Sequence, residues 1–373
     1  MKRKLIQILT WLGVMAGLTL VAMGIWIIGW RGEQSTESLK WLQMLQTCAT
    51  FLLPPLFCAW LWDEGHKPLR WLQMDRGASW QIFAIAIATM VCAIPAINLL
   101  AEVNSRFLDW LLANSDRSRG TIEWMKAREE EATVLTERFL QADSLGGLLV
   151  NIGLMALLPA LAEEMSFRGV LQGVMSRQPS AISRQRSAIS HQPSAVSRQP
   201  SEVSSQPSAV SRQRSECSRQ PSAISLQPSA VSRQKSEVSR QPSEVSHAAI
   251  WVTAFIFSAI HVQFYGFVPR MLMGAMFGYV LAWTGSLWVP IVMHFVNNGV
   301  AVVSYQISAV RSQPSDVSLQ PSDVSLQEAE KSIADTIGAG DTWWVGLISL
   351  AAVCGLLWLI ANRKCGGPAL DAP

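Results

Sequence analysis

A pair of glutamates and an arginine lie inside an otherwise apolar stretch of the chain. Glu163, Glu164 and Arg168 belong to LPALAEEMSFRGVLQG, residues 158–173, which is apolar enough to lie in a membrane. A charged side chain in a spanning segment costs about 2.5–3.5 kcal/mol, so such residues usually face the protein interior or a wet cavity. Glu164 and Arg168 are four positions apart and can pair along one helix face, whereas Glu163 is turned about 100° away, towards a possible cavity. Pro159 can kink the helix one turn earlier.

Two histidines and an asparagine in other apolar stretches extend this set. Of the five histidines, only His261 and His294 lie within apolar runs, and Asn298 shares a helix face with His294. A carboxylate and imidazoles can activate water by proton abstraction, or around Zn²⁺ or another divalent metal ion. An amide and a second imidazole can donate hydrogen bonds to an oxyanion. These residue types indicate peptide hydrolysis; a metal site would use Glu163, His261, His294 and Asn298, and a metal-free mechanism remains equally open.

The elements that position these residues are predicted to be transmembrane helices. The chain has 373 residues, of which 50% are hydrophobic and 15% charged, and a net charge of +3 that gives no case for nucleic-acid binding. We predict an all-α, polytopic transmembrane helix bundle with disordered repeat loops, because about 20 apolar residues cross a bilayer. The predicted spans, about eight in number, are residues 5–28, 41–62, 80–100, 147–174, 248–265, 267–284, 287–305 and 342–361.

Charge near the ends of the spans predicts the orientation. The first apolar run follows MKRK and has no cleavage site of the small-x-small type, so we expect an uncleaved helix. Basic residues favour the cytoplasmic side, which places both termini in the cytoplasm when the number of spans is even. The layout is typical of a bacterial inner (cytoplasmic) membrane protein, with the lipid bilayer and a peptide as its partners.

A seven-residue repeat interrupts the helices. Ten units such as SRQPSAI cover residues 176–245, and a shorter version recurs in residues 312–327. Most units carry proline, which removes helix hydrogen bonds, so the repeats are predicted to be disordered and not a coiled coil. Between the third and fourth predicted spans, residues 123–141 predict either an amphipathic helix over the pocket or a solvated connector.

These features divide the chain into five parts, listed here in order. They are the first three helices and an outside loop (1–142), the core helices (143–175 and 247–305), the repeat insert (176–246), a repeat-containing outside loop (306–341), and the last helix with its tail (342–373).

Three motifs on successive predicted helices carry a family resemblance. EEMSFR (Glu163–Arg168), FSAIH (Phe257–His261) and HFVNN (His294–Asn298) match the E-E-x-x-x-R, F-x-x-x-H and H-x-x-x-N patterns. The chain resembles the CAAX protease and bacteriocin-processing (CPBP, Abi) family of intramembrane endopeptidases over residues 145–305, apart from the repeat. Removing the repeat restores the family's usual interval between the first two motifs, so we interpret the repeat as an insertion into a loop.

The resemblance implies a role for each matching residue. Glu163 would activate water, and His261 would assist it or bind a metal ion. His294 and Asn298 would stabilise the oxyanion or complete a metal site. Glu164 would have the less important role of the two glutamates. Arg168 and Phe257 would be supporting residues. The expected reaction is hydrolysis of a membrane-associated protein or peptide. The alternative is a polytopic transporter or non-catalytic scaffold that uses the same cluster for ion binding or packing, because buried ionisable groups suit that role too.

Overall fold

Every element in the described part of the chain is a helix. The computed structural model describes residues 2–31, 35–142, 144–177, 245–311 and 343–363. Both repeats, and the disorder predicted for them, fall outside these ranges. All described residues except Arg177 belong to one compact unit, Met1–Ser176 with Val245–Pro373. The predicted all-α class is therefore confirmed.

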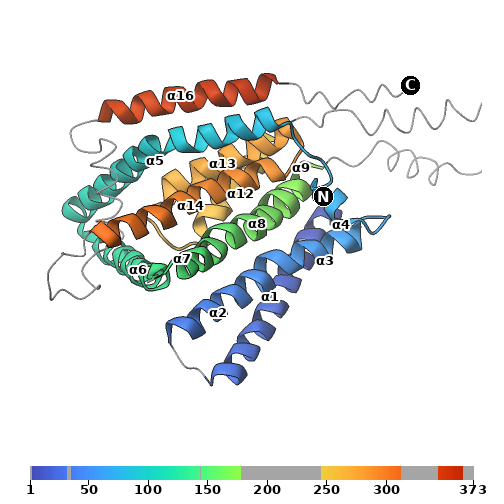
Figure 1. Cartoon of the computed structure of the whole chain (residues 1–373), viewed down its shortest axis with the longest axis horizontal. Coiled ribbons are helices and arrows are strands. Elements are labelled where there is room, and N and C mark those ends of the chain that lie inside the picture. Colours follow the sequence, from blue (N-terminus) through green and yellow to red (C-terminus); the bar gives the residue numbers. More distant parts are fainter. Residues whose placement is uncertain (1, 32–34, 143, 178–244, 312–342, 364–373) are drawn as a thin grey trace, which may run out of the picture. The chain divides into compact units, whose positions relative to one another are not determined.

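Each predicted apolar run contains a helix. In Figure 1, α5, α13, α14 and α8 run side by side, with α16 along α5 and α1 along α2. The elements are α1 (Lys2–Trp30), α2 (Thr36–Thr47), η1 (Cys48–Leu52), α3 (Leu53–Trp62), α4 (Pro68–Trp71), α5 (Trp80–Asn114), α6 (Asp116–Leu140), α7 (Leu145–Asn151), η2 (Ile152–Leu157), α8 (Leu158–Glu164), η3 (Met165–Gln172), α9 (Gly173–Ser176), α12 (His247–Ala259), α13 (Phe267–Thr284), α14 (Trp288–Arg311) and α16 (Trp343–Asn362).

Several of these helices are long and apolar enough to cross a membrane. Among the described residues, five spans meet that criterion: Lys2–Trp30, Thr36–Trp62, Trp80–Asn114, Leu145–Ser176 and Trp343–Asn362. Their outer faces carry large exposed apolar side chains, including Leu20, Ile28 and Trp358. Such faces fit contact with lipid, because apolar patches of this extent are unusual on soluble proteins.

Prolines shape two of the spans through wide helical turns. The π-helical turns η1 and η2 immediately precede Pro54 and Pro159, so the break predicted at Pro159 is present as a wide turn. Proline has no N–H to donate to the carbonyl one turn earlier. The Phe51 carbonyl, four residues before Pro55, instead accepts a hydrogen bond from Ser166 Oγ at 2.9 Å. This bond fixes the second span against the segment that carries the glutamates.

A side-chain hydroxyl also binds backbone groups near a proline where α16 packs on α5. Pro95 lies inside α5, and Ser349 of α16 donates its hydroxyl to the Cys92 carbonyl while accepting the Ala96 N–H at 3.1 Å. A Cβ at Gly346, one turn before Ser349, would lie 2.5 Å from the Leu99 side chain. The last helix therefore packs closely on α5 through small residues.

The turn between α13 and α14 is buried inside the protein. Gly285 takes the left-handed conformation at φ 64° and ends α13. Leu287 and Ser286 are fully buried, the Leu287 N–H donates to the Gln73 carbonyl at 3.1 Å, and Trp288 Nε1 donates to Met74 O at 2.9 Å. The start of α14 is therefore held against the segment after α4 by these hydrogen bonds.

The third predicted helix continues well beyond its expected end. It was predicted to stop at residue 100, but α5 runs to Asn114, and α6 follows it from Asp116 to Leu140. A helix of 35 residues is about 52 Å long, which exceeds the roughly 30 Å hydrocarbon core. Figure 1 shows α6 at the end of the bundle where α5 ends and α7 begins. Residues 123–140 are thus helical within α6, and the place of this helix over the pocket stays a prediction.

Candidate active site

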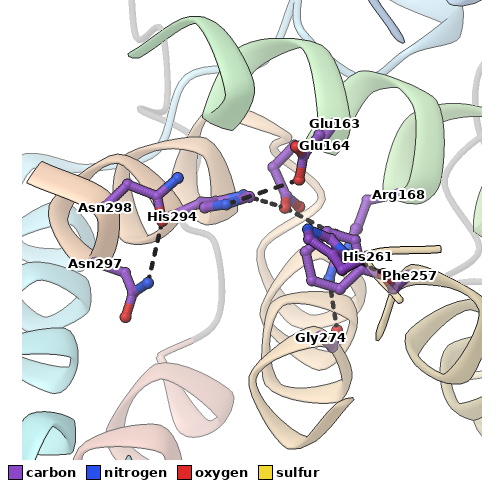
Figure 2. A network of polar contacts seen from close by, with 9 residues as sticks. All are labelled: Glu163, Glu164, Arg168, Phe257, His261, Gly274, His294, Asn297 and Asn298. Atoms are coloured by element: carbon purple, nitrogen blue, oxygen red, sulfur yellow. Dashed lines mark hydrogen bonds and ion pairs between the residues drawn. The ribbon is translucent and has the colours of Figure 1, made fainter. Parts of the chain in front are cut away.

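The predicted glutamate–arginine pair is present and completely buried. Arg168 Nη1 donates to Glu164 Oε1 at 2.8 Å, and both side chains are 0% exposed. The residues follow each other by one turn from α8 into η3, so their side chains meet on one face (Figure 2). The pairing predicted from the spacing is confirmed.

A backbone carbonyl and two aromatic rings also contact the guanidinium of Arg168. Arg168 Nη2 donates to the Gly274 carbonyl at 3.1 Å. The guanidinium carbon lies 4.3 Å from the centre of the Phe257 ring and 5.3 Å from that of Phe277. The positive charge therefore exchanges water for a carboxylate, a carbonyl and two π faces.

The same glutamate oxygen binds His294, the histidine of the third motif. His294 Nδ1 lies 2.9 Å from Glu164 Oε1, across 130 positions of sequence. The imidazole stacks on Phe277, with ring centres 5.5 Å apart, and meets the edge of Phe257 at 5.9 Å. Because Glu164 Oε1 accepts from Arg168, Nδ1 of His294 carries the hydrogen of this bond. Nε2 of the neutral imidazole then keeps its lone pair.

Glu163 lies near Nε2, the other ring nitrogen of His294. Its Oε2 is 4.0 Å from His294 Nε2, and its side chain is 15% exposed, unlike that of Glu164. A separation of 4.0 Å is too long for a direct hydrogen bond, and one water molecule can bridge two such atoms. The structure therefore brings Glu163 and His294 together at one depth.

His261 occupies a different position from the one predicted. The run 248–265 was predicted to be helical, but α12 ends at Ala259 and His261 lies in the following turn. Its Nδ1 donates to the Phe257 carbonyl at 2.8 Å, and its ring meets the Phe257 ring at 5.2 Å. Within the described ranges, no hydrogen bond or ion pair joins His261 to Glu163. The Phe257 ring instead connects His261 to His294, whose ring it meets at 5.9 Å (Figure 2).

The asparagine of the third motif is oriented by its neighbour. Asn297 Nδ2 donates to Asn298 Oδ1 at 3.1 Å. Because the amide oxygen of Asn298 is occupied, its N–H₂ group can donate elsewhere. Asn298 lies one turn beyond His294 on α14, as the spacing predicted.

The segment that supplies both histidines matches a known family. Residues 227–300 match the family model described as type II CAAX prenyl endopeptidase Rce1-like. The chain carries an Rce1-like segment. No curated protein and no solved structure matches the chain.

The Rce1-like segment contains α12, α13 and the first half of α14, with the second and third motifs. It does not include Glu163, Glu164 or Arg168, which reach it through the contacts described above. The family match agrees with the resemblance drawn from all three motifs, and together with the apolar spans it identifies an integral membrane protein.

The site has side chains that can bind a metal ion, but they are not grouped as a ready metal centre. Among the described residues, no group of three or more His, Cys, Asp and Glu side chains could hold one metal ion. Glu163 Oε2 and His294 Nε2 are 4.0 Å apart, and His261 keeps its lone pair on Nε2 because its Nδ1 donates to the Phe257 carbonyl. In the described part of the chain the predicted ligands Glu163, His261 and His294 are therefore not grouped around one point, and the use of a metal ion stays a prediction.

Three residues at the site were not predicted to take part. Phe277 stacks on His294 and contacts Arg168, and Gly274 supplies the carbonyl for Arg168. Arg270 interacts electrostatically with Glu163 and stands beside the turn of His261. An arginine in an apolar run was a usable signal for Arg270, whereas Phe277 and Gly274 look like ordinary packing residues in the sequence.

Proposed function

We propose that this protein is an intramembrane endopeptidase that hydrolyses a peptide bond of a membrane-associated protein or peptide. The observation that carries the proposal is the 4.0 Å separation of Glu163 Oε2 and His294 Nε2, in a site built by the three motifs. The Rce1-like match supports the reaction class. The exposed apolar faces of the surrounding helices support a substrate that arrives from the membrane.

Glu163 and His294 have complementary tasks in this reaction. A water molecule between them can give one hydrogen to Glu163 Oε2 and direct the other to His294 Nε2. Glu163 removes the first proton, the water oxygen forms a bond to the substrate carbonyl carbon, and the carbonyl becomes an oxyanion. When the carbon–nitrogen bond breaks, Glu163 returns the proton to the leaving nitrogen, so atoms and charge balance.

Glu164 and Arg168 hold His294 in the required form. Glu164 accepts the hydrogen on Nδ1, which directs the Nε2 lone pair to the water, and Arg168 balances the buried carboxylate charge. Glu164 is therefore an orienting group in this scheme and not a second base.

Asn298 is the donor available for the oxyanion. Its oxygen accepts from Asn297, which leaves the N–H₂ group to donate. A neutral His294 carries no hydrogen on Nε2, so it can donate to the oxyanion only as an imidazolium. His261 also holds its hydrogen on Nδ1, which leaves its Nε2 as an acceptor for water or a passing proton.

Replacement of Glu163 tests the proposal. Glu163→Gln keeps the shape of the side chain but removes the base, so peptide cleavage by the purified protein in liposomes should fall by about 10²–10⁴-fold. Glu130→Gln, on the exposed side of α6, is the matched control and should cleave at the wild-type rate. Thermal unfolding in detergent shows whether both variants are folded. A folded Glu163→Gln variant that cleaves normally would contradict the proposal.

A chelator decides between the metal-free scheme and the predicted alternative with Zn²⁺. We propose the metal-free form because the described donors are not grouped for an ion. Dialysis against a zinc chelator should then leave peptide cleavage unchanged. Loss of cleavage that returns on addition of Zn²⁺ would show that a metal ion is required.

A further inference from the structure

The turn that carries His261 has an unfavourable backbone conformation. Val262, directly after the histidine, has φ 52°, in the left-handed region. A β-branched residue rarely adopts this conformation, because its Cβ crowds the backbone. Such a residue persists where surrounding contacts determine the conformation, and these positions cluster at active sites. The contacts that hold residues 260–266 therefore bear on the position of His261.

The far end of α5 binds this turn from one side. Asn104 Nδ2 donates to the carbonyls of Phe264 at 2.9 Å and Tyr265 at 2.6 Å. Both hydrogens of one amide group are thus spent on consecutive carbonyls, across 160 positions of sequence. Tyr265 Oη adds a hydrogen bond to Asp109 Oδ1 at 3.3 Å, one helix turn further along α5.

α6 binds the same turn from a second side. Glu129 Oε2 accepts the Tyr265 N–H at 3.3 Å, and the Trp124 ring packs against Phe264 with centres 5.5 Å apart. At the base of the turn, Arg270 of α13 donates to the carbonyl and side-chain oxygens of Gln263, at 3.3 and 2.8 Å. Side chains from three helices therefore determine a turn that has no regular secondary structure of its own.

We propose that Asn104 is a positioning residue for His261. It acts through the carbonyls of Phe264 and Tyr265, to which its amide donates. Its amide supplies a donor to the Tyr265 carbonyl and a second donor to the Phe264 carbonyl, which also accepts the Phe267 N–H at 3.3 Å. These bonds hold the conformation in which Val262 is strained and His261 Nδ1 donates to the Phe257 carbonyl. The catalytic consequence rests on the proposed function, whereas the effect on the turn does not.

Two variants at Asn104 and a matched control on the same helix test the inference. Asn104→Ala removes the donors, and Asn104→Asp replaces them with an oxygen that faces two carbonyl oxygens. Asn114→Ala and Asn114→Asp are the controls, because Asn114 is on α5 and donates to Trp110 O, on its own helix. Hydrogen exchange of residues 260–266 should accelerate at least tenfold in both Asn104 variants and remain unchanged in the controls.

Cleavage kinetics add a readout that loss of stability alone would not produce. Misplacing a reacting group by about 1 Å can cost about 10²-fold in rate. We expect kcat of the folded Asn104→Ala enzyme to fall about tenfold or more with KM within a factor of about two. Val262→Gly, which adopts a positive φ without strain, should restore most of kcat in the Asn104→Ala background.

The outcomes separate this inference from the proposed function. Unchanged exchange in residues 260–266 of a folded Asn104 variant overturns the positioning role, whether or not the protein cleaves peptides. Accelerated exchange with unchanged kcat overturns it as well, because the turn would then move without consequence. A wild-type protein without peptidase activity contradicts the proposed function, and the exchange experiment then still decides what Asn104 does to the turn.

Discussion

Phe257 contacts two parts of the site, which differ in how their side chains are held in place. On one side, Glu164, Arg168 and His294 are buried in helical segments, and both Arg168 and His294 bind Glu164 Oε1. On the other side, His261 stands in an irregular turn whose conformation depends on residues of α5, α6 and α13. The first part should lose stability when it is altered, and the second should lose the placement of one side chain.

Arg168→Met should give the largest loss of stability. It leaves the Glu164 carboxylate buried without its counter-charge, which costs about 3–5 kcal/mol. Thermal or denaturant unfolding in detergent measures this loss. Arg106→Met is the control, because Arg106 is exposed and its pair with Glu102 is worth less than about 1 kcal/mol.

The double variant Glu164→Gln/Arg168→Met sharpens this prediction. With neither charge present, it should be more stable than Arg168→Met alone, because a buried unpaired charge is the costly element. If Arg168→Met unfolds like the Arg106→Met control, the buried pair does not stabilise this half of the site.

Gly278→Ala should give the next largest effect, through the close approach of α13 to its neighbours. A Cβ there would lie 2.7 Å from Gln172 Oε1 and 2.9 Å from Ile250 Cγ2, where Gln172 Nε2 now donates to the Gly278 carbonyl at 3.0 Å. Forcing these groups apart should cost about 1–3 kcal/mol on unfolding.

Gly299→Ala, on α14, is the matched change in open space. A Cβ at Gly299 has no neighbour within 4 Å, so the alanine should stabilise the helix by up to about 1 kcal/mol. Equal effects of the two alanines would show that close packing at Gly278 does not contribute to the buried half.

At Val262, glycine should give a more stable protein than alanine, which is the reverse of the usual order of stability. Because φ is 52°, Val262→Gly should be more stable than Val262→Ala by about 1 kcal/mol. At Ala127, exposed on the regular helix α6, Ala127→Gly should instead lose about 1 kcal/mol. Thermal unfolding of the variants decides this, and the ordinary order at position 262 would mean that the turn is not strained.

The two halves also differ in how far the sequence could predict them. The pairing of Glu164 with Arg168, and the shared face of His294 and Asn298, follow from a spacing of four on a helix. The family motifs then indicate which of these residues meet. The helices themselves were predictable because each lies in an apolar run of sufficient length.

The end of α12 could not be predicted in the same way. FSAIHVQFYGF continues the apolar run to Gly266 without a local stop signal, so helix was expected up to residue 265. The helix ends at Ala259 because the next residues bind partners that are distant in sequence, Asn104 and Glu129 among them. Local pattern carries no information about such contacts. The burial of the turn around Leu287, just before α14, likewise depends on a partner distant in sequence, the segment after α4.

The smallest effect concerns the charge that α6 places against the turn. Burial raises the pKa of the Glu129 carboxyl above its ordinary value of 4.5, against the opposing effects of the Tyr265 N–H and Arg270. A carboxyl whose pKa is raised by folding favours the folded state at low pH, and this contribution is lost as the pH rises through the raised pKa. Because Glu129 is about half buried, the change should stay below about 1 kcal/mol.

Glu129→Gln isolates this contribution, because the amide oxygen can still accept the Tyr265 N–H without carrying a charge. The melting temperature of Glu129→Gln minus that of the wild type should therefore rise from pH 4 to pH 8 as the wild-type carboxyl ionises. Glu130→Gln, on the exposed side of the same helix, is the matched control. A difference that falls with pH would mean that the attraction of Glu129 to Arg270 outweighs the cost of burying its charge, and that α6 holds the His261 turn by an ion pair more than by a hydrogen bond.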